Sequence, residues 1–166
     1  MTMTLSGTTG GIGVIGSGTA VASTSGTSID FTSLPAGLKR ITVMFNGVST
    51  NGTSIIQLQL GSGSFTTTGY VSSGSNLSGS VSTTSSTTGL IIAGAAAASD
   101  LRSGSFVLTN LSSNIWTMTG AAYIASGFGS VCSGMISLGG ALDRVRITTV
   151  NGTDTFDAGS INILYE

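Results

Sequence analysis

Six acidic side chains are the only carboxylates that could support acid–base or metal chemistry in this chain: Asp30, Asp100, Asp143, Asp154, Asp157 and Glu166. Asp154 and Asp157 lie close together near an expected turn, and their oxygens could bind a hard cation. Aspartates in turns more commonly accept hydrogen bonds from nearby backbone amides, and this interpretation is favoured. Asp143 is followed directly by Arg144, which predicts a local charge pair.

Nucleophilic catalysis is disfavoured because the chain has no histidine to activate its many serines. A Ser–Lys pair would depend on Lys39, at the start of an expected strand. Residues 10–13 resemble part of a phosphate-binding loop, but no strand precedes them and no Lys-Ser or Lys-Thr pair follows. With so few acids, a carboxylate pair for glycoside hydrolysis is also disfavoured. The sequence therefore predicts a protein that is not an enzyme, with no catalytic residue, cofactor or metal ligand.

Two tyrosines are the candidates for contact with a receptor, since each offers a hydroxyl among small residues: Tyr70 and Tyr123. Core or interface packing is nevertheless favoured over ligand contact for both. Trp116 alternates with other strand residues and is predicted to lie in the core rather than to form a sugar-stacking platform. Cys132, the only cysteine, is predicted to be a buried small apolar residue, and a single cysteine excludes a disulfide-rich scaffold.

Low charge restricts the possible partners of this 166-residue chain. Only 7% of its residues are charged and its net charge is −1, so no basic surface is available for nucleic acid or an anionic membrane. The longest apolar stretch, residues 90–98, is too short to cross a bilayer, and no secretion signal is visible at the start, which predicts synthesis in the cytoplasm. Because weak charge does little to keep copies apart, we expect much neutral surface to be buried between subunits.

Two-residue alternation predicts an all-β chain, an antiparallel β-sandwich of jelly-roll type with an extended Gly-rich N-terminal arm. The arm covers residues 1–18 and one sandwich domain covers residues 19–166. Strands 39–46 and 56–60 are expected to be antiparallel neighbours, the second half-buried, with residues 61–88 forming short irregular strands or a disordered insert. Residues 39–47 and 145–152 are alike, which is interpreted as common hairpin chemistry rather than as pairing. Residues 89–98 are expected to form a strand followed by a loop, with a terminal helical turn as the alternative. The other expected strands cover residues 19–24, 28–31, 105–111, 114–125, 129–138, 142–150 and 160–166.

Two segments resemble bacteriophage tail-fibre and other virion-surface β-domains. Residues 27–54, which include LPAGLKRITV at 34–43, resemble a segment that recurs in those proteins, and residues 142–163, with LDRVRI followed by NGTDTFDAGSINI, resemble the end of the same domains. The opening LSGTTG at residues 5–10 is similar to the start of short phage fibre proteins. No shaft precedes the domain, which favours a tip bound to another protein, or a capsid decoration protein.

The resemblance implies a virion structural protein, a tail-fibre or receptor-binding subunit that attaches the particle to its host. The expected assembly is a homotrimer, whose N-terminal arm binds another virion protein and whose neutral surface binds a host-surface glycan. A capsid decoration or cement protein is the alternative. Neither interpretation involves nucleic acid or insertion into a membrane.

Overall fold

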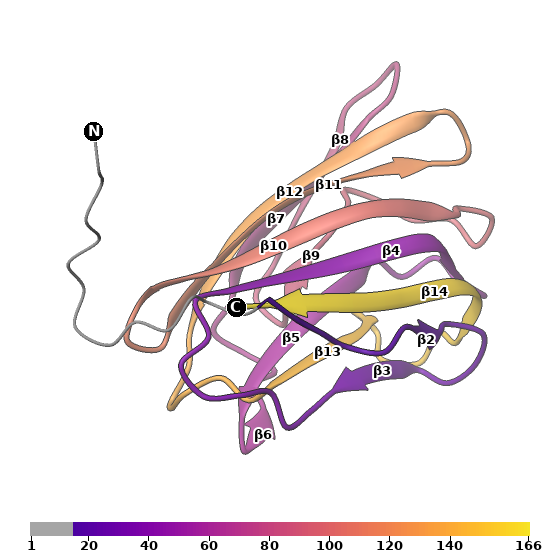
Figure 1. The fold of residues 1–166 in the computed structure, drawn as a ribbon. Coiled ribbons are helices and arrows are strands. Elements are labelled where there is room, and N and C mark those ends of the chain that lie inside the picture. Colours follow the sequence, from indigo (N-terminus) through magenta and orange to yellow (C-terminus); the bar gives the residue numbers. More distant parts are fainter. Residues whose placement is uncertain (1–14) are drawn as a thin grey trace, which may run out of the picture.

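Strands that alternate apolar and small polar residues form two antiparallel sheets, which face each other across an apolar core (Figure 1). The computed structural model describes residues 15–166. The larger, nine-stranded sheet consists of β1 (Gly16–Ser17), β2 (Val21–Ala22), β4 (Arg40–Thr50), β7 (Val71–Leu77), β8 (Ser82–Ser86), β10 (Arg102–Ser112), β11 (Ile115–Ile124), β12 (Phe128–Ser137) and β14 (Phe156–Tyr165). Their spatial order is β1-β14-β4-β10-β11-β12-β7-β8, and β2 also pairs with β14.

The smaller sheet has five strands: β3 (Ser28–Phe31), β5 (Ile56–Ser62), β6 (Ser64–Phe65), β9 (Leu90–Ile91) and β13 (Arg144–Thr149). Its order is β3-β13-β5-β6, and β9 pairs with β5. Connections cross repeatedly from one sheet to the other, while β10, β11 and β12 form a meander. This confirms the predicted all-β antiparallel sandwich. The described part of the chain contains no apolar helix of the length that a bilayer crossing requires.

Most predicted strands are present, but the pairing expected for strands 39–46 and 56–60 is wrong, because β4 and β5 belong to different sheets. The Asn46-Gly47 pair, a typical turn signal, lies inside β4, where Gly47 has a φ of 62°. The register with β10 slips by one residue there, which marks a β-bulge. β4 therefore continues to Thr50 before the chain crosses to β5. The similar segments in β4 and β13 also lie in different sheets.

The predicted arm, residues 1–18, falls mostly outside the described residues. Its last part, Gly16–Ser17, forms β1 and pairs with Tyr165 and Leu164 of β14. The region 61–88, for which short irregular strands were expected, contains β6, β7 and β8. Residues 89–98 form the short strand β9 followed by a loop, as predicted.

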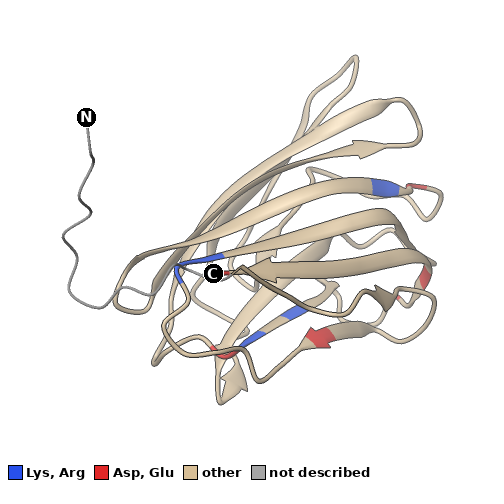
Figure 2. Ribbon diagram, viewed as in Figure 1, with Lys and Arg blue, Asp and Glu red and all other residues tan. Residues whose placement is uncertain are grey.

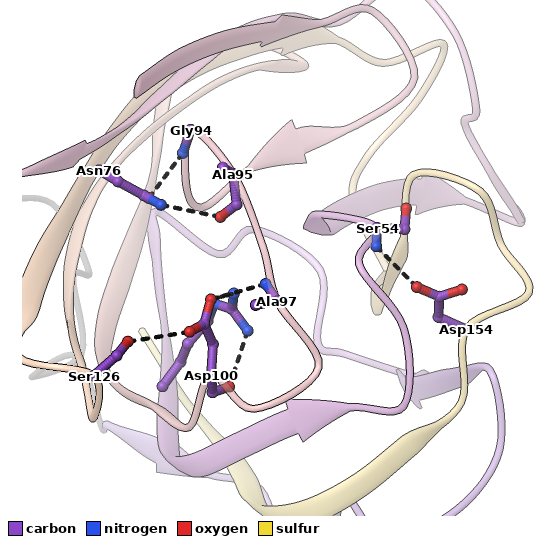
Figure 3. A network of polar contacts seen from close by, with 9 residues as sticks. Ser54, Asn76, Gly94, Ala95, Ala97, Asp100, Ser126 and Asp154 are labelled. Carbon is purple, nitrogen blue, oxygen red and sulfur yellow. Dashed lines mark hydrogen bonds and ion pairs between the residues drawn. The ribbon is translucent and has the colours of Figure 1, made fainter. Parts of the chain in front are cut away.

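Residues 92–100, here called the covering segment, pack against the inner side of β7 (Figure 3). The Asn76 side chain accepts a hydrogen bond from the Gly94 N–H at 3.1 Å and donates one to the Ala95 carbonyl at 3.2 Å. Thr84 of β8 donates to the Gly94 carbonyl at 2.6 Å. The backbone groups of Gly94 and Ala95 that have no strand partner are thereby hydrogen-bonded to side chains, as buried polar groups require.

A buried ion pair holds the end of the covering segment. Arg102 is 1% exposed, and its Nη2 atom donates to Asp100 Oδ2 at 2.9 Å. Asp100 also accepts hydrogen bonds from the Ala97 N–H and the Ser126 hydroxyl (Figure 3). Burial lowers the pKa of the Arg102 guanidinium and the charge of Asp100 opposes this effect. Because a buried charge without its partner is strongly destabilising, the pair constrains the loop between β9 and β10.

We expect Gly94→Ala to destabilise the protein by about 1–3 kcal/mol, since an overpacked core must distort to admit a methyl group. A Cβ atom at Gly94 would overlap the carbonyl oxygen of Ser82. Gly79→Ala is the matched control, because a Cβ there meets nothing within 4 Å. Urea denaturation of both variants measures the difference, and equal stabilities would show that the covering segment does not pack closely on β8.

Candidate functional site

Tyr70 is buried at 1% exposure, so the prediction that it offers an exposed contact is wrong. β6 and β9 both pair with β5, and a gap between them leaves the Leu60 N–H without a strand partner. The Tyr70 hydroxyl fills this gap: it accepts a hydrogen bond from Leu60 at 2.8 Å and donates one to the Thr66 carbonyl at 2.9 Å. Burial raises the pKa of the Tyr70 phenol to about 12, although the Leu60 hydrogen bond opposes the shift. The phenol is therefore protonated at neutral pH and able to donate.

The structure places Tyr123 on the surface, and Trp116 and Cys132 in the interior. Tyr123 is 59% exposed on the outward side of β11, and its role in receptor contact stays a prediction. Trp116 lies in the core, as predicted. Cys132 is also buried as predicted, and desolvation raises the pKa of its thiol to about 12, which suppresses the reactive thiolate.

Every acidic side chain makes a structural contact. Asp154 accepts a hydrogen bond from the Ser54 backbone N–H at 2.9 Å (Figure 3), so its backbone donor lies in a distant segment rather than in its own turn as predicted. Asp157 accepts one from the Ser49 hydroxyl. Asp143 pairs with Arg144 as predicted, and hydrogen bonds from Arg144 lower the pKa of its carboxyl group. The three remaining pairs are Asp30–Arg146, Asp100–Arg102 and Glu166–Arg40. Among residues 15–166 no three acidic or sulfur ligands cluster as a metal site.

A polar pocket of about 320 Å³ lies on the outward side of the smaller sheet. β5 contributes Gln57 and Gln59, and β13 contributes Arg146 and Thr148. Residues 27–28, Thr67, Thr88, Thr149 at the end of β13 and the turn 150–152 complete the lining, here called the rim. The register explains the grouping, because Thr148 lies opposite Ser28 of β3 on one side and Gln57 of β5 on the other.

The two glutamines correct the expectation that strand 56–60 is half-buried. Gln57 is 1% exposed and Gln59 is 7% exposed, so both faces of β5 are covered. The cover comes from Thr88, whose carbonyl accepts a hydrogen bond from Gln59 Nε2 at 2.9 Å and whose hydroxyl donates to Gln57 Oε1 at 3.1 Å. Gln57 Nε2 also makes a long contact of 3.4 Å with the Thr149 carbonyl.

Arg146 is held in a fixed orientation at one side of the pocket. Its Nε and Nη2 atoms donate to the two oxygens of Asp30 at 2.8 Å and 2.7 Å, a bidentate arrangement. These hydrogen bonds raise the pKa of the guanidinium. The group also lies 4.1 Å from the centre of the Phe65 ring, within the range of a cation–π contact. Charge within the pocket is thus balanced, while the Nη1 atom of Arg146 is left out of the Asp30 contacts.

The pocket offers amide and hydroxyl groups that can both donate and accept hydrogen bonds. This chemistry suits recognition of a polar ligand. Sequence reasoning missed Gln57 and Gln59, although they are the only glutamines in the chain. Their alternation with leucines is typical of a solvated strand face. The signal that could have found them is their size, because most other polar strand residues in this chain are the smaller serine and threonine.

Comparisons of this chain with protein-family models, with curated proteins and with solved structures find no match.

We expect Tyr70→Phe to lower the free energy of unfolding by about 1–3 kcal/mol, because the buried Leu60 N–H would lose its acceptor. Tyr123→Phe, on the exposed side of β11, should change it by no more than about 0.5 kcal/mol. Denaturant titration of the two variants tests the difference. A Tyr70→Phe protein as stable as the control would mean that the hydroxyl bridge adds nothing to the sheet edge.

Proposed function

We propose that this chain is a structural protein of a bacteriophage particle, a tail-fibre or receptor-binding subunit that attaches the particle to its host. The two segments that resemble virion-surface domains support this proposal, because they pair with each other in both sheets. β3, from the first segment, pairs with β13 in the smaller sheet. β4 of the first segment pairs with β14 in the larger sheet. Segments more than a hundred residues apart thus form one structural unit.

The observation that carries the proposal is an uncharged face on the larger sheet, defined as the outward side of β10, β11, β12, β7 and β8. These strands carry a single charged position (Figure 2), which is Arg102. Its side chain is buried and pairs with Asp100. Val71, Val131 and Met135 are 69%, 42% and 41% exposed on this face. A shallow depression of about 530 Å³ lies between these strands, lined by Val71, Met135 and several Ser and Thr residues.

A face of this kind is typical of a surface that other protein covers. Soluble proteins usually carry interspersed charges, and exposed apolar groups that gather in one place mark interaction sites. We therefore assign the uncharged face, on which Tyr123 also lies, to contacts between copies of the chain in a homotrimer. This assignment places Tyr123 between subunits rather than against a receptor. Residues 1–18 are assigned to attachment to another virion protein. Three linked copies would strengthen a weak contact with a host-surface glycan by raising its effective concentration.

A capsid decoration protein is the second candidate. The same uncharged face could pack against neighbouring capsid subunits, and its exposed valines favour lasting contact with protein. In that case residues 1–18 would contribute to contacts with the capsid rather than with the tail.

Electron cryo-microscopy of the purified particle tests the two candidates. We expect density for the sandwich at the tail or its fibres, and antibody labelling of separated tails and emptied heads provides an independent control. Density on the capsid lattice would overturn the attachment proposal in favour of decoration.

Val131→Glu should disrupt association of the isolated chain, because Val131 lies near the middle of the uncharged face, between Ala121 and Ser75. A buried carboxylate without a partner is unfavourable, and we expect subunit dissociation constants to rise at least tenfold. Val150→Glu is the matched control, since Val150 is 44% exposed but follows β13 of the smaller sheet. Light scattering after size-exclusion chromatography measures the masses. A monomeric unsubstituted chain, or equal effects of the two variants, would contradict the assignment.

A further inference from the structure

The two glutamines of the polar pocket are nearly buried and yet have unused hydrogen-bonding capacity. A glutamine amide can donate two hydrogen bonds and accept two. Gln59 makes one contact with the described residues, through Nε2 to Thr88, so its Oε1 atom and a second N–H are without a protein partner. Gln57 accepts one hydrogen bond from Thr88 and makes only the long Nε2 contact with Thr149. No atom of either amide is both buried and without a partner, so the unpartnered groups of Gln59 reach solvent in the pocket and are accessible to a ligand.

We infer that this pocket binds an uncharged sugar residue of a saccharide. The inference rests on the proposed attachment function for its biological purpose, and on the pocket geometry for its chemistry. A sugar hydroxyl donates one hydrogen bond and accepts others, which complements an amide that presents both N–H and C=O groups. The hydroxyl of Ser28, which also lines the pocket, can donate and accept. The hydroxyls of Thr88 and Thr148 already donate to Gln57 Oε1 and to the Thr27 carbonyl, and they remain available as acceptors.

Charge balance selects against an ionic ligand. Among residues 15–166, Arg146 is the only charged residue that lines the pocket, and Asp30 holds two of its nitrogen atoms. A phosphate or carboxylate would therefore meet no net positive charge, and a cation would meet no free carboxylate. The N–H groups of Arg146 Nη1 are left to donate to a neutral oxygen.

The pocket is large enough for a small ligand, and its polar lining selects against a purely apolar one. Its volume of about 320 Å³ lies at the lower end of the range for small-ligand sites, about 300–1,000 Å³. Val150 is the only large apolar residue among those that line it. An apolar ligand would leave the glutamine amides desolvated without partners, which is unfavourable.

A steric block at the rim tests the inference without removing any hydrogen bond of the pocket. Thr67 is exposed and lines the pocket, whereas the adjacent Thr68 is also exposed but does not line it. Thr67→Trp should abolish saccharide binding, and Thr68→Trp should leave it unchanged. Gln59→Leu, which removes the amide inside the pocket, should weaken binding at least tenfold. Thermal unfolding of each variant verifies that it folds.

The probes are oligosaccharides of neutral hexoses, N-acetylhexosamines and 6-deoxyhexoses, compared with sialylated and sulfated ones. Saturation-transfer NMR and an immobilised array measure binding to the full chain. Binding to a neutral probe that is lost in Thr67→Trp and retained in Thr68→Trp supports the inference. Binding to none of the neutral probes, binding only to acidic probes, or binding that Thr67→Trp leaves intact would overturn it.

Localisation of the chain on the particle and the saccharide-binding measurements together separate this inference from the proposed function. A chain that lies on the tail of the particle but binds no neutral saccharide would overturn only the pocket assignment. A chain that binds the saccharide through the pocket but lies on the capsid lattice would overturn only the attachment function.

Discussion

Pairing between the two ends of the described chain is the constraint on which the rest of the structure depends. β14 pairs with β4 in the larger sheet, and β13 lies between β3 and β5 in the smaller one. Each contact joins residues far apart in sequence, so the loop-closure entropy must be overcome before either sheet is complete. Formation of the core is therefore expected to be slow and cooperative, as in other proteins dominated by non-local strand pairing.

Local alternation predicted most of the strands, because it depends only on neighbouring residues. It did not predict to which sheet each strand belongs. Asn46-Gly47 illustrates the reason: the same two residues suit a hairpin turn and a β-bulge, and only the contact with β10 decides between them. Trp116 was correctly predicted to lie in the core, because its large side chain and its position in the alternating pattern both favour burial.

The candidate site was less predictable because its burial comes from a distant segment. Gln57 and Gln59 alternate with leucines as in a solvated strand face, yet Thr88, about thirty residues later, covers them. Tyr70 was misjudged for a related reason: its hydroxyl suggested a contact with solvent, whereas the gap between β6 and β9 provides a buried donor and acceptor. The contact of Thr88 with the glutamines and the hydrogen-bonding groups around Tyr70 cannot be recognised before the strand topology is known.

The sandwich separates two kinds of surface on opposite sides of one core. The uncharged face belongs to the larger sheet, while the polar pocket lies on the outward side of the smaller sheet. Subunits that associate through the first surface would leave the second open to solvent. Each added copy would then present one more pocket without altering it, and weak hydrogen-bonded contacts would combine through effective concentration rather than through a larger single site. The low charge of the chain and the placement of its nearly buried amides thus support the same proposal, in which one sheet mediates association and the other binds the ligand.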